Sequence, residues 1–108
     1  MQRILVVDDA EINRELLRDV LNEDYVVETA ADGAEALLLL EGTFDTMSAL
    51  LLDLNMPKMN GFAVLDEMEK RHWMGKLPVL VISGECSPEI ESMCLNLGVS
   101  DFIHKPFE

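Results

Sequence analysis

The stretch LLLDLNMPKMNG (residues 50–61) decides the fold of this chain. Four apolar residues, Ala49 to Leu52, lead directly into Asp53, and a segment rich in Asn, Pro and Gly follows. A short continuous apolar run bounded by turn residues is typical of a strand buried on both faces, as in a parallel sheet. The carboxyl ends of such strands are where ligands bind, so Asp53 is a candidate functional residue.

Working outward, similar short runs recur on both sides of this strand. They span residues 4–7, 25–30, 78–83 and 99–104. Helical patterns separate them at residues 11–23, 34–40, from 62 to about 73–75, and 87–98. Such alternation predicts an α/β fold, a doubly wound five-stranded parallel sheet with helices on both faces and right-handed crossovers. The length of 108 residues suits one domain.

The helical segments carry three specific expectations. In residues 11–23 one apolar stripe should face the core, formed by Ile12, Leu16, Leu17, Val20 and Leu21. Asp32 should cap the next helix and Gly42 should end it. The block 37–40 in that helix is more apolar than one helix face needs, which indicates either core burial or a contact patch for a partner.

The charge balance limits the classes of partner. Asp and Glu number 21 against 8 Lys and Arg, a formal charge of −13. This surface repels phosphate backbones, so no direct nucleic-acid binding is expected of this segment, whereas cations and basic partners are favoured. Cys86 and Cys94 fit neither a disulfide framework nor a zinc pattern. With no membrane span and no signal sequence in the pattern, we expect a cytoplasmic domain.

The residues at the predicted strand ends form a chemically coherent set. It comprises Asp8, Asp9, Asp53, Ser83, Gly84 and Lys105. Clustered carboxylates repel one another, and a divalent cation such as Mg²⁺ removes that repulsion. A carboxylate beside Mg²⁺ can take a phosphoryl group, while a hydroxyl, an ammonium and a glycine N–H receive its oxygens. Taken singly, each residue has a simpler interpretation: Asp8 or Asp9 could cap the helix at Glu11, Ser83 could be a turn residue, and Lys105 a solvated charge.

The motifs ILVVDD, LLLDLNMPKMNG, VLVIS-G and HKPF, in this order and spacing, resemble the receiver domain of bacterial two-component response regulators. The resemblance covers residues 3–107 and implies the flavodoxin-like strand order 2-1-3-4-5. It also implies a phosphorylation-dependent signalling switch, partnered by a sensor histidine kinase and by a downstream effector domain or protein. By the same resemblance the chain promotes its own phosphoryl transfer and dephosphorylation but is not a multiple-turnover enzyme.

The resemblance assigns roles residue by residue. Asp53 resembles the phosphoacceptor, and Asp8, Asp9, Asp53 and the backbone carbonyl of Asn55 resemble the ligands of Mg²⁺ or Mn²⁺. Ser83, Gly84 and Lys105 would contact the phosphoryl group, and Ser83 with Phe102 would form the switch, in which Phe102 turns from outside to inside. Asn55 and Glu85 would tune hydrolysis, so that the phosphoryl group is lost fairly quickly.

Two features depart from the family pattern. Phe102 lacks the hydroxyl of a tyrosine at that place, so it has no hydrogen-bonded outward rotamer. The closing C-terminal helix is also lacking, so we expect residues 1–108 to be a receiver domain cut before its last helix, or one covered by a neighbouring chain as a homodimer. The usual dimer surface would include that helix.

Three rival functions are weaker. A haloacid-dehalogenase phosphatase needs a second Asp two residues after the nucleophile, where this chain has Asn55. A flavin-binding module needs a hydroxyl- and glycine-rich loop after the first strand, where this chain has DDAEIN. An unphosphorylated docking module would not need the whole set of acids, hydroxyl and lysine.

Overall fold

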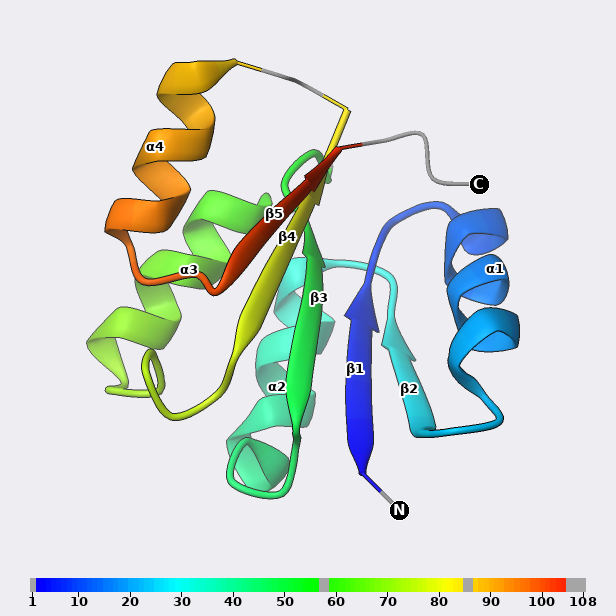
Figure 1. Cartoon of the computed structure of the whole chain (residues 1–108). Helices are drawn as coiled ribbons and strands as arrows, with labels where there is room; N and C mark the ends of the chain where they lie inside the picture. The colour runs from blue at the N-terminus through cyan, green and yellow to red at the C-terminus, as the bar shows by residue number, and fades with distance from the viewer. Residues whose placement is uncertain (1, 57–58, 85–86, 105–108) are drawn as a thin grey trace.

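A computed structural model describes residues 2–56, 59–84 and 87–104 (Figure 1). Strands and helices alternate along these residues. Their bounds are β1 Arg3–Val7, α1 Glu11–Leu21, β2 Val26–Ala30, α2 Gly33–Thr43, β3 Ala49–Asp53, α3 Gly61–Lys70, β4 Val79–Ser83, α4 Pro88–Asn96 and β5 Asp101–His104. The predicted alternation is therefore confirmed. The first and third strands are each one residue longer than predicted, and the other three begin one or two residues later.

The strands form one parallel sheet in the order β2-β1-β3-β4-β5, as predicted. Because all strands run in the same direction, their carboxyl ends lie at one edge of the sheet (Figure 1). The register aligns Val7 of β1 with Ala30 of β2 and with Leu52 of β3. Val7 ends β1 and lies beside Leu52, the residue before the end of β3, so Asp8 and Asp53 both follow directly from this aligned pair.

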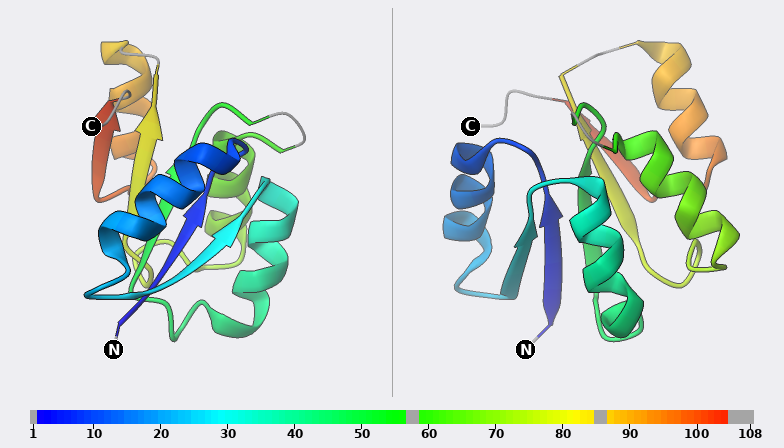
Figure 2. Two further views of the ribbon diagram at one scale, coloured as in Figure 1. Left: turned by 90° about the vertical axis from the view of Figure 1, so that its right-hand side faces the viewer. Right: turned by 180° about the vertical axis from the view of Figure 1, so that it is seen from behind.

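Alternate strand residues face two separate cores. Leu5, Leu50 and Val81 belong to the larger core, which α2, α3 and α4 cover. Val6, Leu51 and Ile82 belong to a smaller core on the opposite face, against which α1 packs (Figure 2). In the part of the chain that the structure describes, α1 is the one helix on that face, and the closing C-terminal helix is lacking, as expected.

Of the five apolar residues of α1 that were predicted to face the core, two do so. Leu17 and Leu21 pack against the smaller core. Ile12 and Val20 are instead 76% and 65% exposed, and Leu16 is also exposed. These three residues repeat every four positions and form a neighbouring stripe that is turned away from the sheet. Periodicity identified the apolar side of the helix but not how much of it another element covers.

Helix α2 runs past the glycine that was expected to end it. Gly42 lies inside the helix, and the N–H of Phe44 donates to the carbonyl of Leu40 at the C-terminus. The predicted cap at the other end is confirmed, because Asp32 Oδ1 accepts the N–H of Glu35 at 2.9 Å. In the apolar block Leu37 and Leu40 are buried and Leu38 is exposed, so core burial accounts for most of it.

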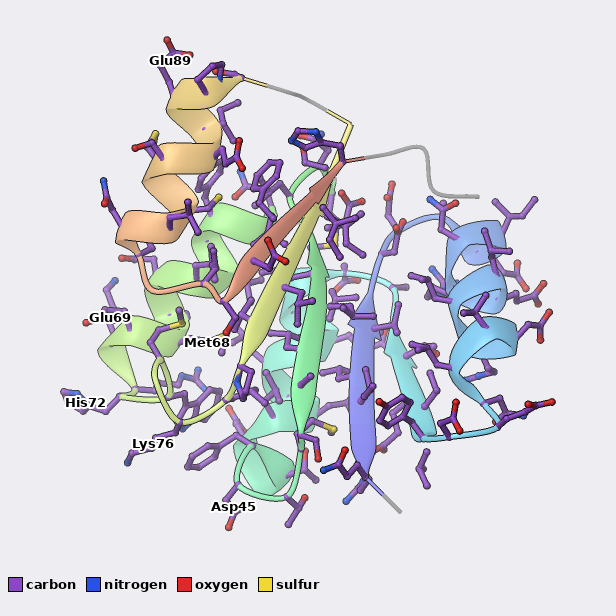
Figure 3. The ribbon with its side chains drawn as sticks, in the orientation of Figure 1. Asp45, Met68, Glu69, His72, Lys76 and Glu89 are labelled. Atoms are coloured by element: carbon purple, nitrogen blue, oxygen red, sulfur yellow. The ribbon has the colours of Figure 1, made fainter. Side chains whose placement is uncertain are left out.

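Trp73 covers the end of α3. It is buried, stacks on Phe44 with ring centroids 4.9 Å apart, and lies beneath the guanidinium of Arg71 at 5.1 Å. Figure 3 shows His72 and Lys76 at this end of the molecule, far from Glu89. Among the described helices, no segment is long and apolar enough to cross a membrane.

Candidate metal centre

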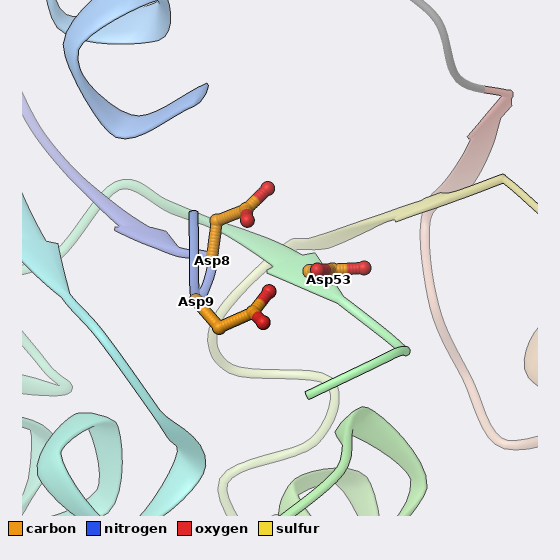
Figure 4. Close-up of side chains that lie close together, drawn as sticks. All are labelled: Asp8, Asp9 and Asp53. Atoms are coloured by element: carbon orange, nitrogen blue, oxygen red, sulfur yellow. The ribbon is translucent and has the colours of Figure 1, made fainter. Parts of the chain in front are cut away.

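Three carboxylates converge at the carboxyl edge of the sheet. Asp8 and Asp9 follow β1, and Asp53 is the last residue of the adjacent β3. One oxygen from each lies within 4.8 Å of the others, and Figure 4 shows the three side chains turned toward the same space. Asp8 and Asp53 are each 1% exposed, whereas Asp9 is exposed. The buried pair therefore comes from two strands and the third acid borders solvent.

Asp8 is held in place by the chain on both sides of it. Its Oδ1 accepts the N–H of Ala10 at 2.9 Å, and its Oδ2 accepts the side-chain amide of Asn13 at 3.3 Å. The guanidinium of Arg14 donates to its backbone carbonyl at 2.7 Å. Its own N–H donates to the carbonyl of Ala30 at the end of β2, at 3.1 Å. The carboxylate of Asp8 is therefore fixed in orientation.

The alternative role of Asp8 or Asp9 as a helix cap is wrong. The residue at the N-cap of α1 is Ala10, whose side chain makes no cap hydrogen bond. Asn13 and Arg14 also hold Asp8, although neither residue was predicted to belong to the site. Their position in the sequence could have indicated this role, because side chains in the first turn of a helix that directly follows a strand can reach back to the end of that strand.

The loop after Asp53 returns sharply to the strand. The N–H of Asn55 donates to Asp53 Oδ1 at 3.1 Å, and the N–H of Gly61 donates to the carbonyl of Leu54 at 3.0 Å. Leu54 and Met56 are buried beneath the loop, and the Asn55 side chain is exposed. The first bond orients the carboxylate, and the second closes the loop at the start of α3.

Gly61 is the position at which this loop requires a glycine. A Cβ there would lie 2.7 Å from Leu54 Cα and 2.8 Å from the carbonyl oxygen of Asp53. Both neighbours are backbone atoms, so no rotamer change relieves the contact. The preceding residue, Asn60, caps α3 by accepting the N–H of Ala63 at 3.0 Å. Together they set where the helix begins relative to Asp53.

Ser83 lies at the same edge of the sheet. It is the last residue of β4, it is 1% exposed, and the preceding Ile82 is in register with Asp53. Gly84 follows it directly and is exposed. Lys105 and Glu85, which the sequence analysis also assigned to the site, lie outside the described residues. The structure thus brings Asp8, Asp9, Asp53 and Ser83 to one edge.

Phe102 occupies an inward position. It is 8% exposed and belongs to the larger core, and its ring also meets that of the exposed His104 edge-on, with centroids 5.2 Å apart. By the family resemblance, this side chain is expected to move from outside to inside. The structure describes the inside position.

The donor set fits a hard divalent cation. Three carboxylates supply oxygen ligands only, and two of them are buried side by side, where their mutual repulsion is weakly screened by solvent. Mg²⁺ is bound through one or two carboxylates, retained waters and phosphate oxygens. Because Asp9 is exposed, water and an incoming phosphoryl group can reach a cation that is bound beside it.

Comparison with known proteins agrees with this arrangement. Residues 4–108 match the response regulator receiver domain family. The chain is 38% identical over 108 residues to the transcriptional regulatory protein CpxR of Klebsiella pneumoniae, covering 99% of this chain and 44% of that protein. It therefore spans less than half the length of that relative.

Solved structures show the same fold. The chemotaxis protein CheY4 of Vibrio cholerae superimposes with a TM-score of 0.90 at 32% identity, over 100% of this chain and 89% of that one. The CheX–CheY–BeF3–Mg²⁺ complex of Borrelia burgdorferi gives a TM-score of 0.86 at 30% identity, over 99% of this chain and 80% of that one.

Proposed function

This chain belongs to the response regulator receiver domain family, and from that premise we propose that it is a phosphorylation-dependent signalling switch with Asp53 as phosphoacceptor. The observation that carries the proposal is the grouping of Asp8, Asp9 and Asp53 within 4.8 Å. Because Asp53 ends its strand in a buried site beside two further acids, it can act as a nucleophile only where a cation offsets their charge.

Mg²⁺ is the proposed cofactor, with Mn²⁺ as its substitute. Asp8, Asp9, Asp53 and the backbone carbonyl of Asn55 would hold it, and its charge would offset that of the phosphoryl oxygens. An oxygen of Asp53 attacks phosphorus, the bond from phosphorus to the kinase histidine breaks, and its electron pair returns to the imidazole. The N–H of Asn55, 3.1 Å from Asp53 Oδ1, keeps the carboxylate oriented for this attack.

The transferred phosphoryl group would be received by Ser83, Gly84 and Lys105. Ser83 is buried beside the acids, which supports a hydroxyl contact, and Gly84 allows a close approach of its N–H. Movement of Ser83 would alter the packing of Phe102 and the surface of α4 and β5. That surface exposes Met93, Leu95 and Leu97, which a partner can contact.

The proposed partners are a sensor histidine kinase and a downstream effector domain or protein. A homodimer remains part of the proposal, and direct nucleic-acid binding by this segment does not, because of the charge of −13. The chain would act on its own phosphoryl group and not on an external substrate in repeated turnover. Asn55 and Glu85 would orient the hydrolytic water, so that the phosphoryl group is lost fairly quickly and not held for many hours.

The proposal is tested by incubation with acetyl phosphate and Mg²⁺, followed by intact-mass measurement. We expect one hydroxylamine-labile phosphoryl group in the native protein and none in Asp53→Asn. Asp45→Asn is the matched control, because Asp45 is an exposed acid near the opposite end of the sheet (Figure 3). Phosphorylation of Asp53→Asn to the same extent as the native protein would overturn the assignment, as would its absence from the native protein.

A further inference from the structure

The segment that joins β2 to α2 contacts two parts of the chain beside the acidic site. On one side, the carbonyl of Ala30 accepts the N–H of Asp8 at 3.1 Å. On the other side, Gly33 packs against the segment that follows Asp53: a Cβ on Gly33 would lie 2.6 Å from the carbonyl oxygen of Met59. The turn therefore lies between the strand end that carries Asp8 and the loop that follows Asp53.

The turn is fixed by its own hydrogen bonds. Asp32 Oδ1 accepts the N–H of Glu35 at 2.9 Å, and Glu35 Oε2 accepts the N–H of Ala31 at 3.3 Å. Such a reciprocal arrangement of side chains satisfies the free N–H groups at a helix start and sets the direction in which the helix begins. Gly33 is thus a rigid contact point for the loop.

The loop can transmit a displacement of Met59 to Asp53. Met59 lies two residues before Gly61, whose N–H donates to the carbonyl of Leu54, the residue after Asp53. Gly61 is itself in close contact with the backbone of Asp53 and Leu54. The loop therefore has little room to absorb a shift between Gly33 and Gly61 without moving the backbone beside Asp53.

We propose that Gly33 is a positioning residue for the metal site: its lack of a side chain lets α2 seat residues 59–61, which contact the backbone of Asp53 and Leu54, at the separation from Asp8 that a shared cation requires. The inference rests on the proposed function, because it concerns the same Mg²⁺. Gly33 has no side chain to offer as a ligand, so its effect would pass through its contact with Met59. Mg²⁺ demands near-ideal octahedral geometry, so a small displacement of one ligand-bearing segment weakens binding.

The test compares two glycines of the same helix. Gly33→Ala places a methyl group against Met59, whereas Gly42→Ala places one where no atom lies within 4 Å. The protein is titrated with Mg²⁺ alone, and the changes in the backbone amide NMR shifts of Asp9 and Asn55 give the Kd for Mg²⁺. We expect Gly33→Ala to raise this Kd by about 10-fold to 100-fold, the usual effect of disturbing residues that orient metal ligands. Gly42→Ala leaves it unchanged.

A second pair of variants separates positioning from packing. The Cβ of Gly33→Ala would also lie 2.6 Å from Val64 Cγ2, and Val64→Ala removes that side-chain contact. The double variant Gly33→Ala/Val64→Ala should lie closer in melting temperature to Val64→Ala than Gly33→Ala lies to the native protein, because the clash with Val64 is gone. Its Kd for Mg²⁺ should stay raised, because the contact with the backbone carbonyl of Met59 remains. A merely structural role would make stability and Kd recover together.

The outcomes are distinct. The inference is overturned if Gly33→Ala binds Mg²⁺ as tightly as the native protein, if Kd recovers in the double variant, or if both Gly33 variants fail to fold. A native protein that binds Mg²⁺ but takes no phosphoryl group from acetyl phosphate overturns the proposed function, and the Kd comparison still decides the role of Gly33. A native protein that binds no Mg²⁺ overturns both.

Discussion

Replacing Asp53 by asparagine should stabilise the protein in the absence of Mg²⁺. The carboxylate oxygens of the site lie within 4.8 Å of one another. At that separation and an effective dielectric constant of about 20, two unit charges repel by about 3.5 kcal/mol. Asp53→Asn removes one charge and keeps an oxygen that can accept the N–H of Asn55. Solvent screens the exposed Asp9, and an amide accepts hydrogen bonds from other donors less strongly than a carboxylate does. We therefore expect the free energy of unfolding to rise by only about 1–2 kcal/mol.

The gain should depend on the metal. Urea unfolding is measured in EDTA and in Mg²⁺, with melting temperatures in parallel, where 1 kcal/mol corresponds to about 4–8 °C for a domain of this size. At ten times its Kd, Mg²⁺ should stabilise the native protein by about 1.4 kcal/mol. Mg²⁺ should stabilise Asp53→Asn by less than this amount, since the variant has lost one charged ligand. The difference between the two proteins therefore shrinks when Mg²⁺ is added.

The control for this measurement is Asp45→Asn, which removes the same charge from an exposed position. Its free energy of unfolding should stay within about 0.5 kcal/mol of the native value in both buffers. Two results would refute the electrostatic reasoning: Asp53→Asn being less stable than the native protein in EDTA, or Mg²⁺ stabilising both proteins equally.

Three further predictions concern the elements around the site. Gly61→Ala forces a Cβ against the backbone of Leu54 and should cost about 1–3 kcal/mol in urea unfolding; an unchanged midpoint would contradict the close approach. Asn60→Ala removes the cap of α3 and should cost about 1 kcal/mol, whereas Asn60→Asp, which keeps the acceptor, should cost much less. Burial raises the pKa of the Cys94 thiol, so the unfolded chain loses this proton first as the pH rises. Stability should therefore fall as the pH rises above about 8.5, the ordinary pKa of a thiol, and Cys94→Ala should show a smaller fall over the same range.

The convergence of the acids could be predicted because it follows from topology. A buried parallel strand has a recognisable apolar run, and its last residue is visible in the sequence, as at Asp53. Once the strands are ordered, the neighbours of each strand end are determined, which places Asp8 beside Asp53. Neither step requires knowledge of side-chain packing.

The coverage of α1 could not be predicted, because a single helix pattern does not report which elements lie against it. Ile12 and Leu17 are equally apolar in the sequence, yet only Leu17 packs on the sheet. The end of α2 was missed for a related reason. Gly42 is a weak helix former, but its cost of about 1 kcal/mol is tolerated where Leu40 is buried in the core.

The contacts of Gly33 and Gly61 were also beyond the sequence pattern. Both glycines occur beside turn residues, which is equally consistent with a simple turn. Their role depends on a backbone approach between segments that are far apart in sequence, in the case of Gly33 and Met59. Only the tertiary arrangement shows which glycine has room for a methyl group, as Gly42 does, and which does not.

The exposed stripe of Ile12, Leu16 and Val20 has a consequence for the protein in concentrated solution. At low ionic strength the charge of −13 keeps copies of the chain apart, so these apolar side chains rarely meet another molecule. At about 1 M salt the range of that repulsion shrinks to about 3 Å, while attraction between apolar surfaces persists. Salting-out should therefore begin through α1, and a polar residue at Val20 should raise the salt concentration at which turbidity appears.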